Sequence, residues 1–298
     1  MWKIAHMNEA IESTQRRSIA IDVSVVIPAL NVAETIGQQL DALVHQDFIG
    51  DWEVIVADNG STDATRAVVE TFAGRLPSLR IIDASARKGV NHARNAGTRV
   101  ARGRLVLYCD GDDIVFPNWV SEMTAALHTH DAIGGRVHRF GRPGVKVAFD
   151  PVTFNSTFLS YPFGANCGVK RDIWLRLGGF NEDYDGRAGD EVEFFWRLQL
   201  AGYGLGHAPD AIVRYRLPAK HDIKKSFRNG REAVRLYRDF RESGYPGPNV
   251  GALRGWARII SRAPLALISA TRRSMWLRMV ARHLGRAVGS IKYRHMLL

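Results

Sequence analysis

Four short runs of branched apolar residues lie in the first 110 residues, each separated from the next by a segment long enough for a helix. The runs are VSVVIPA at 23–29, EVIVAD at 53–58, LRIID at 79–83 and RLVLYCD at 104–110. Apolar runs of this length are typical of strands buried on both faces of a parallel sheet. The intervening segments place apolar residues at helical spacing, as at Ile36, Leu40 and Leu43. This order predicts a Rossmann-like α/β fold, with a mostly parallel sheet between helices and a ligand crevice beyond the carboxyl ends of the strands.

Polar residues follow three of these runs, at the strand ends that face the expected crevice. The first run closes with Pro28 and is followed by Asn31 and Glu34, the second ends in DNGSTD at 58–63, and the fourth ends in DGDD at 110–113. Asn-Gly turns and Ser or Thr caps are common in α/β proteins, so residues 61–63 are interpreted as turn and cap residues. Asp58 lies at the strand tip itself, and we expect it to contact a ligand.

The DGDD segment gathers three carboxylates, Asp110, Asp112 and Asp113, within four residues at one strand end. Like charges this close repel one another and destabilise the fold unless a cation neutralises them. Hard oxygen ligands suit Mg²⁺ or Mn²⁺, which bind one or two protein carboxylates together with phosphate oxygens of a substrate. The segment therefore favours a divalent metal site, and a solvated aspartate-rich turn is the alternative.

Six blocks of the chain, in order, resemble the family 2 glycosyltransferases of the GT-A fold. They are VSVVIPALN, VIVADNGSTD, RKGVNHARNAG, DGDD, GGFNE and DEVEFFWRLQLAGY, and they cover roughly residues 22–217. The resemblance implies a nucleoside pocket lined by Pro28, Asn31, Glu34 and Asp58. It also implies donor contacts for Asn59, Arg87, Arg94, Asp110 and Gly111, and a metal site at Asp110 and Asp112. Asn59 stands where many relatives have a second aspartate.

The reaction that the resemblance implies is an inverting transfer of a sugar from a nucleoside-diphosphate sugar, with UDP-sugars favoured, to an acceptor hydroxyl. Mn²⁺ or Mg²⁺ is the expected cofactor. The attacking hydroxyl needs a carboxylate to accept its proton, and the family places this base at the start of the helix after GGF. The position directly before a hydrophobic residue favours Glu191, whereas the residue type favours Asp190. We take Glu191 as the base. The alternative for either residue is that it stabilises the helix N-terminus through the helix dipole. His221, after the last expected strand, is either a third metal ligand, as in some relatives, or a solvated histidine.

Two other functions stay open on the sequence. A sugar-1-phosphate nucleotidyltransferase shares a related fold and metal use, but the glycine-rich phosphate loop of such enzymes is missing from VIPALN. A non-catalytic, membrane-associated protein that retains the donor pocket is the other alternative. The Q-x-x-R-W signature and the transmembrane helices of processive synthases are absent, so we expect a single-addition enzyme of cell-surface polysaccharide, glycolipid or glycoconjugate synthesis.

Three regions are expected along the chain: an N-terminal extension at 1–20, a catalytic domain at 21–220 and a basic helical tail at 221–298. The catalytic domain would comprise a nucleotide-binding half at 21–113 and an acceptor-binding half at 114–220, with a mobile or substrate-facing loop at 141–164. Cys109 and Cys167 lack a metal-binding spacing, which favours a reducing, cytoplasmic location. The longest apolar stretch, at 263–270, is too short to span a bilayer.

The positive charge is concentrated in the tail. Of a net charge of +11, residues from Arg214 onward contribute 20 Lys or Arg against 4 Asp or Glu, whereas the first 213 residues carry 21 basic and 26 acidic groups. Mixed cationic and bulky apolar residues are typical of helices that lie on anionic membranes. Such a tail would suit a lipid-linked acceptor at the inner face of the cell membrane; a helical subdomain packed on the core is the alternative. Nucleic acid is not an expected partner, because the rest of the chain is net acidic, and the oligomeric state stays open.

Overall fold

A computed structural model describes residues 21–140, 153–154, 156–184, 189–217, 223–247 and 252–295 of the chain. The predicted N-terminal extension at 1–20 lies outside the described residues. So do His221 and much of the expected loop at 141–164.

One large sheet forms the centre of the domain, with the strand order β3-β2-β1-β4-β9-β6-β10-β5. Its first four members are the predicted strands, β1 (Val23–Ala29), β2 (Trp52–Asp58), β3 (Leu79–Asp83) and β4 (Leu105–Cys109), and they run parallel. The remaining members are β5 (Ile114–Val115), β6 (Ala132–Phe140), β9 (Asn166–Lys170) and β10 (Leu205–Arg216). β9 runs antiparallel between β4 and β6, while β10 runs parallel to β6. The sheet is therefore mostly parallel, as the apolar runs predict.

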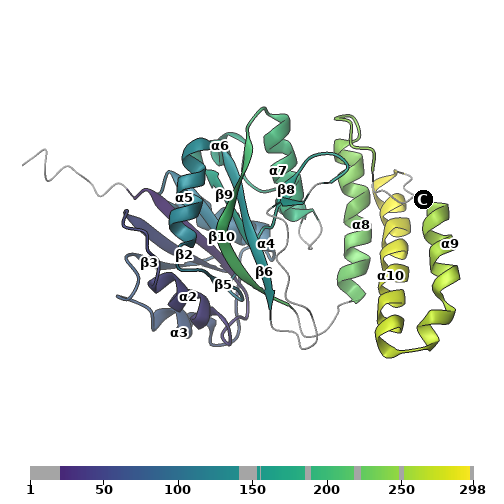
Figure 1. Ribbon diagram of the computed structural model, residues 1–298, viewed down its shortest axis with the longest axis horizontal. Coiled ribbons are helices and arrows are strands. Elements are labelled where there is room, and N and C mark those ends of the chain that lie inside the picture. Colours follow the sequence, from purple (N-terminus) through teal and green to yellow (C-terminus); the bar gives the residue numbers. More distant parts are fainter. Residues whose placement is uncertain are drawn as a thin grey trace, which may run out of the picture.

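Helices cover both faces of this sheet (Figure 1). The helices α2 (Ile36–Val44), α3 (Thr65–Glu70) and α5 (Trp119–Thr129) pack their apolar residues on one face. The helices α4 (Val90–Val100), α6 (Arg171–Arg176) and α7 (Asp190–Leu200) cover the other face. Side chains of β1 alternate between these two cores, since Val25 belongs to the first and Val26 to the second. A strand buried on both faces needs an uninterrupted apolar sequence, which explains the runs.

The described part of the 141–164 segment contains two short strands, β7 (Thr153–Phe154) and β8 (Tyr161–Pro162), which pair antiparallel. Tyr161 also packs against the helix that begins at Asp190, through the cluster formed by Trp196 and its neighbours. The segment thus contributes side chains next to that helix, and its expected mobility stays a prediction.

The C-terminal region is helical, as its sequence predicts. It comprises α8 (Ile223–Phe240), α9 (Ala252–Arg262), the short 3₁₀ helix η2 (Pro264–Leu267) and α10 (Ala270–Tyr293). Figure 1 shows α8, α10 and α9 standing side by side next to the sheet domain, with α8 nearest to it. Leu236 and Phe240 of α8 pack on Tyr184 and Trp196 of the domain. The inner helix is therefore part of the core, in keeping with the subdomain alternative.

Glycines allow α10 to lie close against α8. A Cβ atom at Gly230 of α8 would clash with the carbonyl oxygen of Arg282, and one at Gly285 of α10 would clash with that of Phe227. Small residues at such crossings let two helix backbones approach, which increases packing between their neighbours. The turn between α9 and α10 is less buried than α8, because its apolar side chains Leu267 and Ile268 are 84% and 63% exposed.

Candidate functional site

The carboxyl ends of β1 and β2 meet at one edge of the sheet, and the loops that follow them are joined by hydrogen bonds. Ala29 of β1 is in register with Asp58 of β2. The backbone N–H of Asn31 donates to Ser61 Oγ (3.0 Å), and Thr62 N–H donates to Asn31 Oδ1 (2.8 Å). Asn31 takes a positive φ of 52°, a conformation that asparagine tolerates better than most residues. Asn31 therefore positions these loops against each other.

Residues 61–63 lie in the loop before α3, as predicted, but the N-cap of α3 is Ala64, which has no side-chain capping bond, so the predicted cap role is not confirmed. Asp63 Oδ1 accepts a hydrogen bond from Thr65 N–H (3.0 Å) just before α3, and Ser61 Oγ supports the neighbouring loop. Pro28 and Glu34 lie at the same edge, Pro28 half-buried in β1 and Glu34 exposed before α2.

Asp58 is buried at the tip of β2 and is held as a carboxylate. Its Oδ1 accepts from Ser61 N–H (2.9 Å), and its Oδ2 accepts from Arg66 Nη1 (3.0 Å). Burial opposes ionisation of Asp58, but the hydrogen bonds from Ser61 and Arg66 outweigh burial and lower its pKa. A negative hydrogen-bond acceptor thus sits at the crevice edge.

Asn59 follows Asp58 and has its amide engaged by the backbone of another loop. Its Nδ2 donates to the carbonyl oxygens of Ala84 (2.6 Å) and Arg87 (2.8 Å), and its Oδ1 accepts from Gly89 N–H (2.8 Å). The residue is 3% exposed. Asn59 therefore positions the loop after β3 and the start of α4. Its expected contact with the donor stays a prediction.

Arg94 of α4 is a buried cation beside the DGDD segment. It is 3% exposed, and its Nη2 lies 3.3 Å from Asp110 Oδ1. Burial disfavours its charge, but the carboxylates of Asp110, Asp190 and Glu191 outweigh burial and raise its pKa above the ordinary value. Its Nε and Nη1 atoms have no hydrogen-bond partner among the described residues. Buried donors normally have partners, so an anion in the crevice would complete this site.

The three aspartates of DGDD converge. One carboxylate oxygen of each of Asp110, Asp112 and Asp113 lies within 4.8 Å of those of the others. Burial and the charge of Asp110 raise the pKa of Asp112 to about 6. Burial and the charges of Asp110 and Asp112 raise the pKa of Asp113 well above its usual range. Asp113 Oδ2 is buried without a hydrogen-bond partner among the described residues. Crowded oxygen ligands and an unsatisfied carboxylate oxygen fit a hard divalent cation.

Neighbouring backbone fixes this cluster in place. The N–H of Arg216, at the end of β10, donates to Asp113 Oδ1 (2.8 Å), and its Nε donates to the carbonyl oxygen of Asp112 (2.9 Å). Gly111 is buried below the cluster, where its carbonyl oxygen accepts from Thr35 Oγ1 (3.3 Å). Sequence reasoning missed Arg216, because its contact depends on β10 lying beside β5.

Asp190 and Glu191 begin α7, and their charges act on Arg94. Burial, the charge of Asp190 and a hydrogen bond with it raise the pKa of Glu191 well above its usual range, while Arg94 lowers it in part. Asn91 of α4 donates from Nδ2 to the carbonyl oxygen of Asp190 (3.2 Å), which fixes the start of the helix. The structure therefore gathers Asp110, Arg94 and the two candidate bases into one charged cluster.

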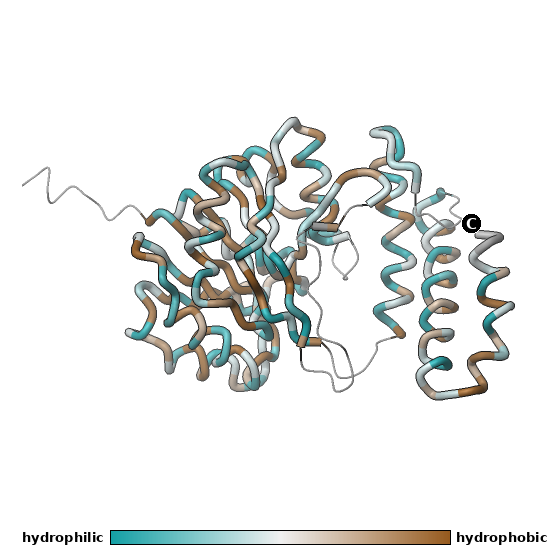
Figure 2. The backbone as a smooth tube through the Cα atoms, in the orientation of Figure 1, coloured by the Kyte–Doolittle hydropathy of each residue, from teal (hydrophilic) through white to brown (hydrophobic). Residues whose placement is uncertain are grey.

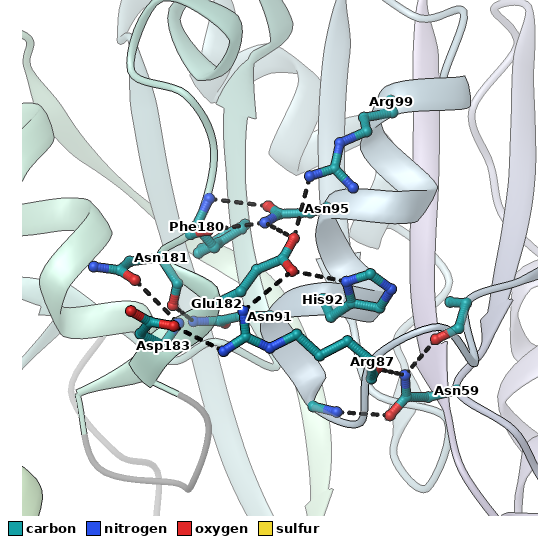
Figure 3. A network of polar contacts seen from close by, with 12 residues as sticks. Asn59, Arg87, Asn91, His92, Asn95, Arg99, Phe180, Asn181, Glu182 and Asp183 are labelled. Atoms are coloured by element: carbon teal, nitrogen blue, oxygen red, sulfur yellow. Dashed lines mark hydrogen bonds and ion pairs between the residues drawn. The ribbon is translucent and has the colours of Figure 1, made fainter.

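A further carboxylate, Glu182 in the 3₁₀ helix η1 (Glu182–Tyr184), joins η1 to α4 (Figure 3). It accepts hydrogen bonds from Asn95 (2.9 Å) and Arg99 (3.1 Å), and His92 Nδ1 lies 2.8 Å from it. Burial opposes its charge, but hydrogen bonds from Asn95, His92 and Arg99 outweigh burial and lower its pKa to about 2. Sequence reasoning missed these roles, although GGFNE contains Glu182 and HARNAG contains His92 and Asn95.

Arg87 joins the same network rather than the acidic cluster. Its Nη2 donates to Asp183 Oδ1 (2.8 Å), as Figure 3 shows. Arg235 of α8 donates to the carbonyl oxygen of Asp183 and stacks on the Tyr184 ring at 4.5 Å. The C-terminal region is therefore linked through η1 to the loop that carries Arg87, whose donor contact stays a prediction.

Comparison with known proteins agrees with this arrangement. Residues 24–166 match the sequence model described as Glycosyl transferase family 2. The glycosyltransferase AglE of Haloferax volcanii is 27% identical over 226 residues, which cover 72% of this chain and 74% of that protein. These matches support a family 2 glycosyltransferase. Validoxylamine A glucosyltransferase of Streptomyces hygroscopicus is also 27% identical, over 60% of this chain and 52% of that protein.

Solved structures support the fold of this glycosyltransferase. The mannosyltransferase PcManGT of Pyrobaculum calidifontis, in complex with GDP-Man and Mn²⁺, superposes with a TM-score of 0.63 at 20% identity, covering 93% of this chain and 91% of that one. TarS of S. aureus in complex with UDP gives a TM-score of 0.55 at 18% identity, covering 92% and 91%. The predicted GT-A fold is thus confirmed. The matched sequences favour a glycosyltransferase over the nucleotidyltransferase and the non-catalytic binding protein that the sequence left open.

Proposed function

We propose that this glycosyltransferase moves a sugar, with inversion, from a nucleoside-diphosphate sugar to an acceptor hydroxyl, with Mn²⁺ or Mg²⁺ as cofactor. The observation that carries the proposal is the buried Arg94, which lies 3.3 Å from Asp110 and is near enough to Asp190 and Glu191 for their charges to raise its pKa. A cation site for a diphosphate and a carboxylate for a hydroxyl proton are the two groups that such a transfer needs.

The donor site proposed here lies along the carboxyl ends of β1, β2 and β4. Asp58 offers a buried carboxylate that can accept hydrogen bonds from a nucleoside, with Pro28, Asn31 and Glu34 on the neighbouring loop. The likeness in fold to proteins crystallised with GDP-Man, UDP and UDP-GlcNAc supports a nucleotide-sugar donor. We favour a UDP-sugar and expect Asn31 to contact its nucleoside.

Asp110 and Asp112 are the proposed metal ligands. Their convergence with Asp113 and the unsatisfied Asp113 Oδ2 are the features that suit a divalent ion. When bound, such an ion neutralises the charge that develops on the departing diphosphate. Arg94 supplies a second positive charge from the protein, and its Nε and Nη1 donors face no competing protein acceptor among the described residues.

Glu191 is the proposed base. Burial and the adjacent Asp190 make its carboxylate more basic than an exposed glutamate, which favours removal of a proton from a hydroxyl. Asp190 starts the helix, and its backbone is tied to Asn91. On this account Asp190 tunes Glu191 electrostatically, while Glu191 accepts the proton as the acceptor oxygen attacks the anomeric carbon.

We also propose that the enzyme works at the cytoplasmic face of the cell membrane, on an acceptor that is lipid-linked. The support is the exposed apolar turn between α9 and α10, with Leu267 84% exposed among numerous arginines. No helix in the described part of the chain is long and apolar enough to cross a bilayer, so the proposed contact is peripheral.

Hydrolysis of UDP-, GDP- and dTDP-sugars in the presence of Mn²⁺ tests the proposed function. We expect one nucleotide class to be turned over with dependence on the metal, and turnover to be lost in Asp112→Ala and in Glu191→Ala. Donor binding should fail mainly in the first variant. Metal-independent turnover of the wild type would contradict the proposal.

A further inference from the structure

A cavity of about 590 Å³ lies between the three C-terminal helices, away from the candidate active site. Its size is within the range of pockets that bind small molecules, roughly 300–1,000 Å³. Six arginines line it: Arg258, Arg262, Arg272, Arg278, Arg282 and Arg286. The described part of its lining includes no acidic side chain.

Like charges in this cavity oppose one another. Burial and the neighbouring charge of Arg282 lower the pKa of Arg286. No acidic residue follows Glu242 in the sequence, so neither α9 nor α10 carries a carboxylate. An anion with several oxygens would relieve this repulsion, and a phosphate presents the oxygen acceptors that guanidinium groups bind in pairs.

Part of the cavity lining is apolar, and we call this part its floor. Trp276, Met275 and Met279 of α10 line it together with Leu265 of η2. The indole N–H of Trp276 donates to the carbonyl oxygen of Ile259 (2.9 Å), which fixes α9 against α10. A free phosphate would gain nothing from such a floor, whereas a phosphate with an attached acyl or prenyl chain would cover it.

Exposed apolar side chains continue from the floor to the surface. Leu265 and Met275, both in the lining, are 42% and 52% exposed, and Leu267 and Ile268 lie next to them in the turn between α9 and α10. Figure 2 shows this turn as a hydrophobic stretch at the end of the hairpin farthest from the chain terminus. Cations above an apolar surface match the interfacial layer of an anionic membrane.

We propose that this cavity is a binding site for the phosphate of an anionic membrane lipid, with the α9–α10 turn inserted beside it. The inference rests on the membrane contact proposed above and assigns that contact to named residues. A lipid held there would orient α8, which is linked through Arg235 and Asp183 to the active-site side of the domain.

The test compares two double variants that each remove two positive charges from the outer helices. Arg258→Gln with Arg282→Gln alters the cavity lining, and Arg273→Gln with Arg294→Gln alters exposed cations outside it. The probes are dihexanoyl phosphatidic acid in calorimetry, and sedimentation with vesicles of phosphatidylglycerol and phosphatidylcholine in equal amounts. Circular dichroism checks that each variant folds. If the cavity variant does not fold, Arg272→Gln in the lining is compared with Arg273→Gln outside it.

We expect the cavity variant to bind the lipid about twenty-five times more weakly, at about fivefold per cation, and the control variant to bind it nearly as the wild type does. Equal losses in both variants would indicate diffuse attraction and overturn the proposal. Inorganic phosphate that binds as tightly as the lipid, or an RNA oligonucleotide that binds in its place, would overturn it too. UDP binding with Mn²⁺, measured on the wild type, reports separately on the proposed function.

Discussion

The guanidinium of Arg94 lies 3.3 Å from the carboxylate of Asp110, between Nη2 and Oδ1, with the arginine side chain almost fully buried. This contact joins α4 to the end of β4 and brings a fixed positive charge to the edge of the sheet where the acidic cluster lies. Because two more donors of Arg94 have no partner among the described residues, the contact leaves Arg94 able to bind a second anion.

Replacing Arg94 by lysine should lower turnover about a hundredfold, because a lysine keeps the charge but cannot place several donors on one diphosphate. Steady-state kinetics with the nucleotide sugar measure this. Arg104→Lys is the control, since Arg104 is exposed at the start of β4. Equal kinetics for Arg94→Lys and the wild type would contradict the proposed role of Arg94.

Asp112→Asn should weaken binding of Mn²⁺ in the presence of UDP by about tenfold or more, because it removes one of the two carboxylates proposed as ligands. Calorimetric titration of Mn²⁺ measures the effect. The control is Asp172→Asn, an exposed carboxylate of α6 that pairs with Arg176 of its own helix. An unchanged Mn²⁺ affinity in Asp112→Asn would exclude Asp112 as a ligand.

Glu191→Gln should lower kcat by about a hundred- to ten-thousandfold with little change in donor affinity, since it removes the proposed base. In the wild type, kcat should fall as the pH falls through the raised pKa of Glu191, because protonation removes the base form. Asp190→Asn should shift this acidic limb to lower pH, because it removes the neighbouring charge that raises the pKa of Glu191. A limb that does not move would contradict the assignment of the two residues.

Glu182→Gln should destabilise the fold by up to about 3 kcal/mol at neutral pH, from the difference between an ordinary pKa of 4.5 and a folded pKa of about 2. The folded pKa is the lower one, so this stability is complete above about pH 4.5 and is lost as the pH falls toward 2. Urea denaturation at several pH values should therefore show the variant and the wild type converging in acid. Glu70→Gln, an exposed change on α3, should show no such difference.

Asn59→Asp should lower stability by about 2 kcal/mol, because a carboxylate cannot donate to the carbonyl oxygens of Ala84 and Arg87 and would repel both. Thermal denaturation measures this loss. Asn118→Asp, at the N-terminus of α5, is the matched control and should have little effect, because aspartate is favoured at that position. Equal stabilities for Asn59→Asp and the wild type would mean that the amide contacts are not required.

The sequence predicted the parts of the fold that depend on local pattern. β1, β2, β3 and β4 are continuous apolar runs, so their existence and order could be read directly. The position of β9 could not be predicted, because it depends on pairings such as Tyr108 with Cys167, which are 59 residues apart and have no local signature.

The same distinction holds for the candidate site. Asp110 and Asp112 could be predicted as site residues, because they follow a strand and lie close together in the sequence. The positioning roles of Asn59 and Glu182 could not, because their hydrogen-bond partners are distant in the sequence. The sequence could nominate Glu191 by register, but the burial that makes it basic comes from its position in the folded chain.

A crystal of the protein soaked with Mn²⁺ and UDP tests the central claim most directly, with anomalous scattering recorded at the manganese edge. We predict an anomalous peak coordinated by Asp110 and Asp112, with the diphosphate bound to the same ion and Arg94 in contact with its oxygens. Nucleotide bound elsewhere, or an ordered nucleotide in the crevice with no manganese at these two carboxylates, would contradict the account.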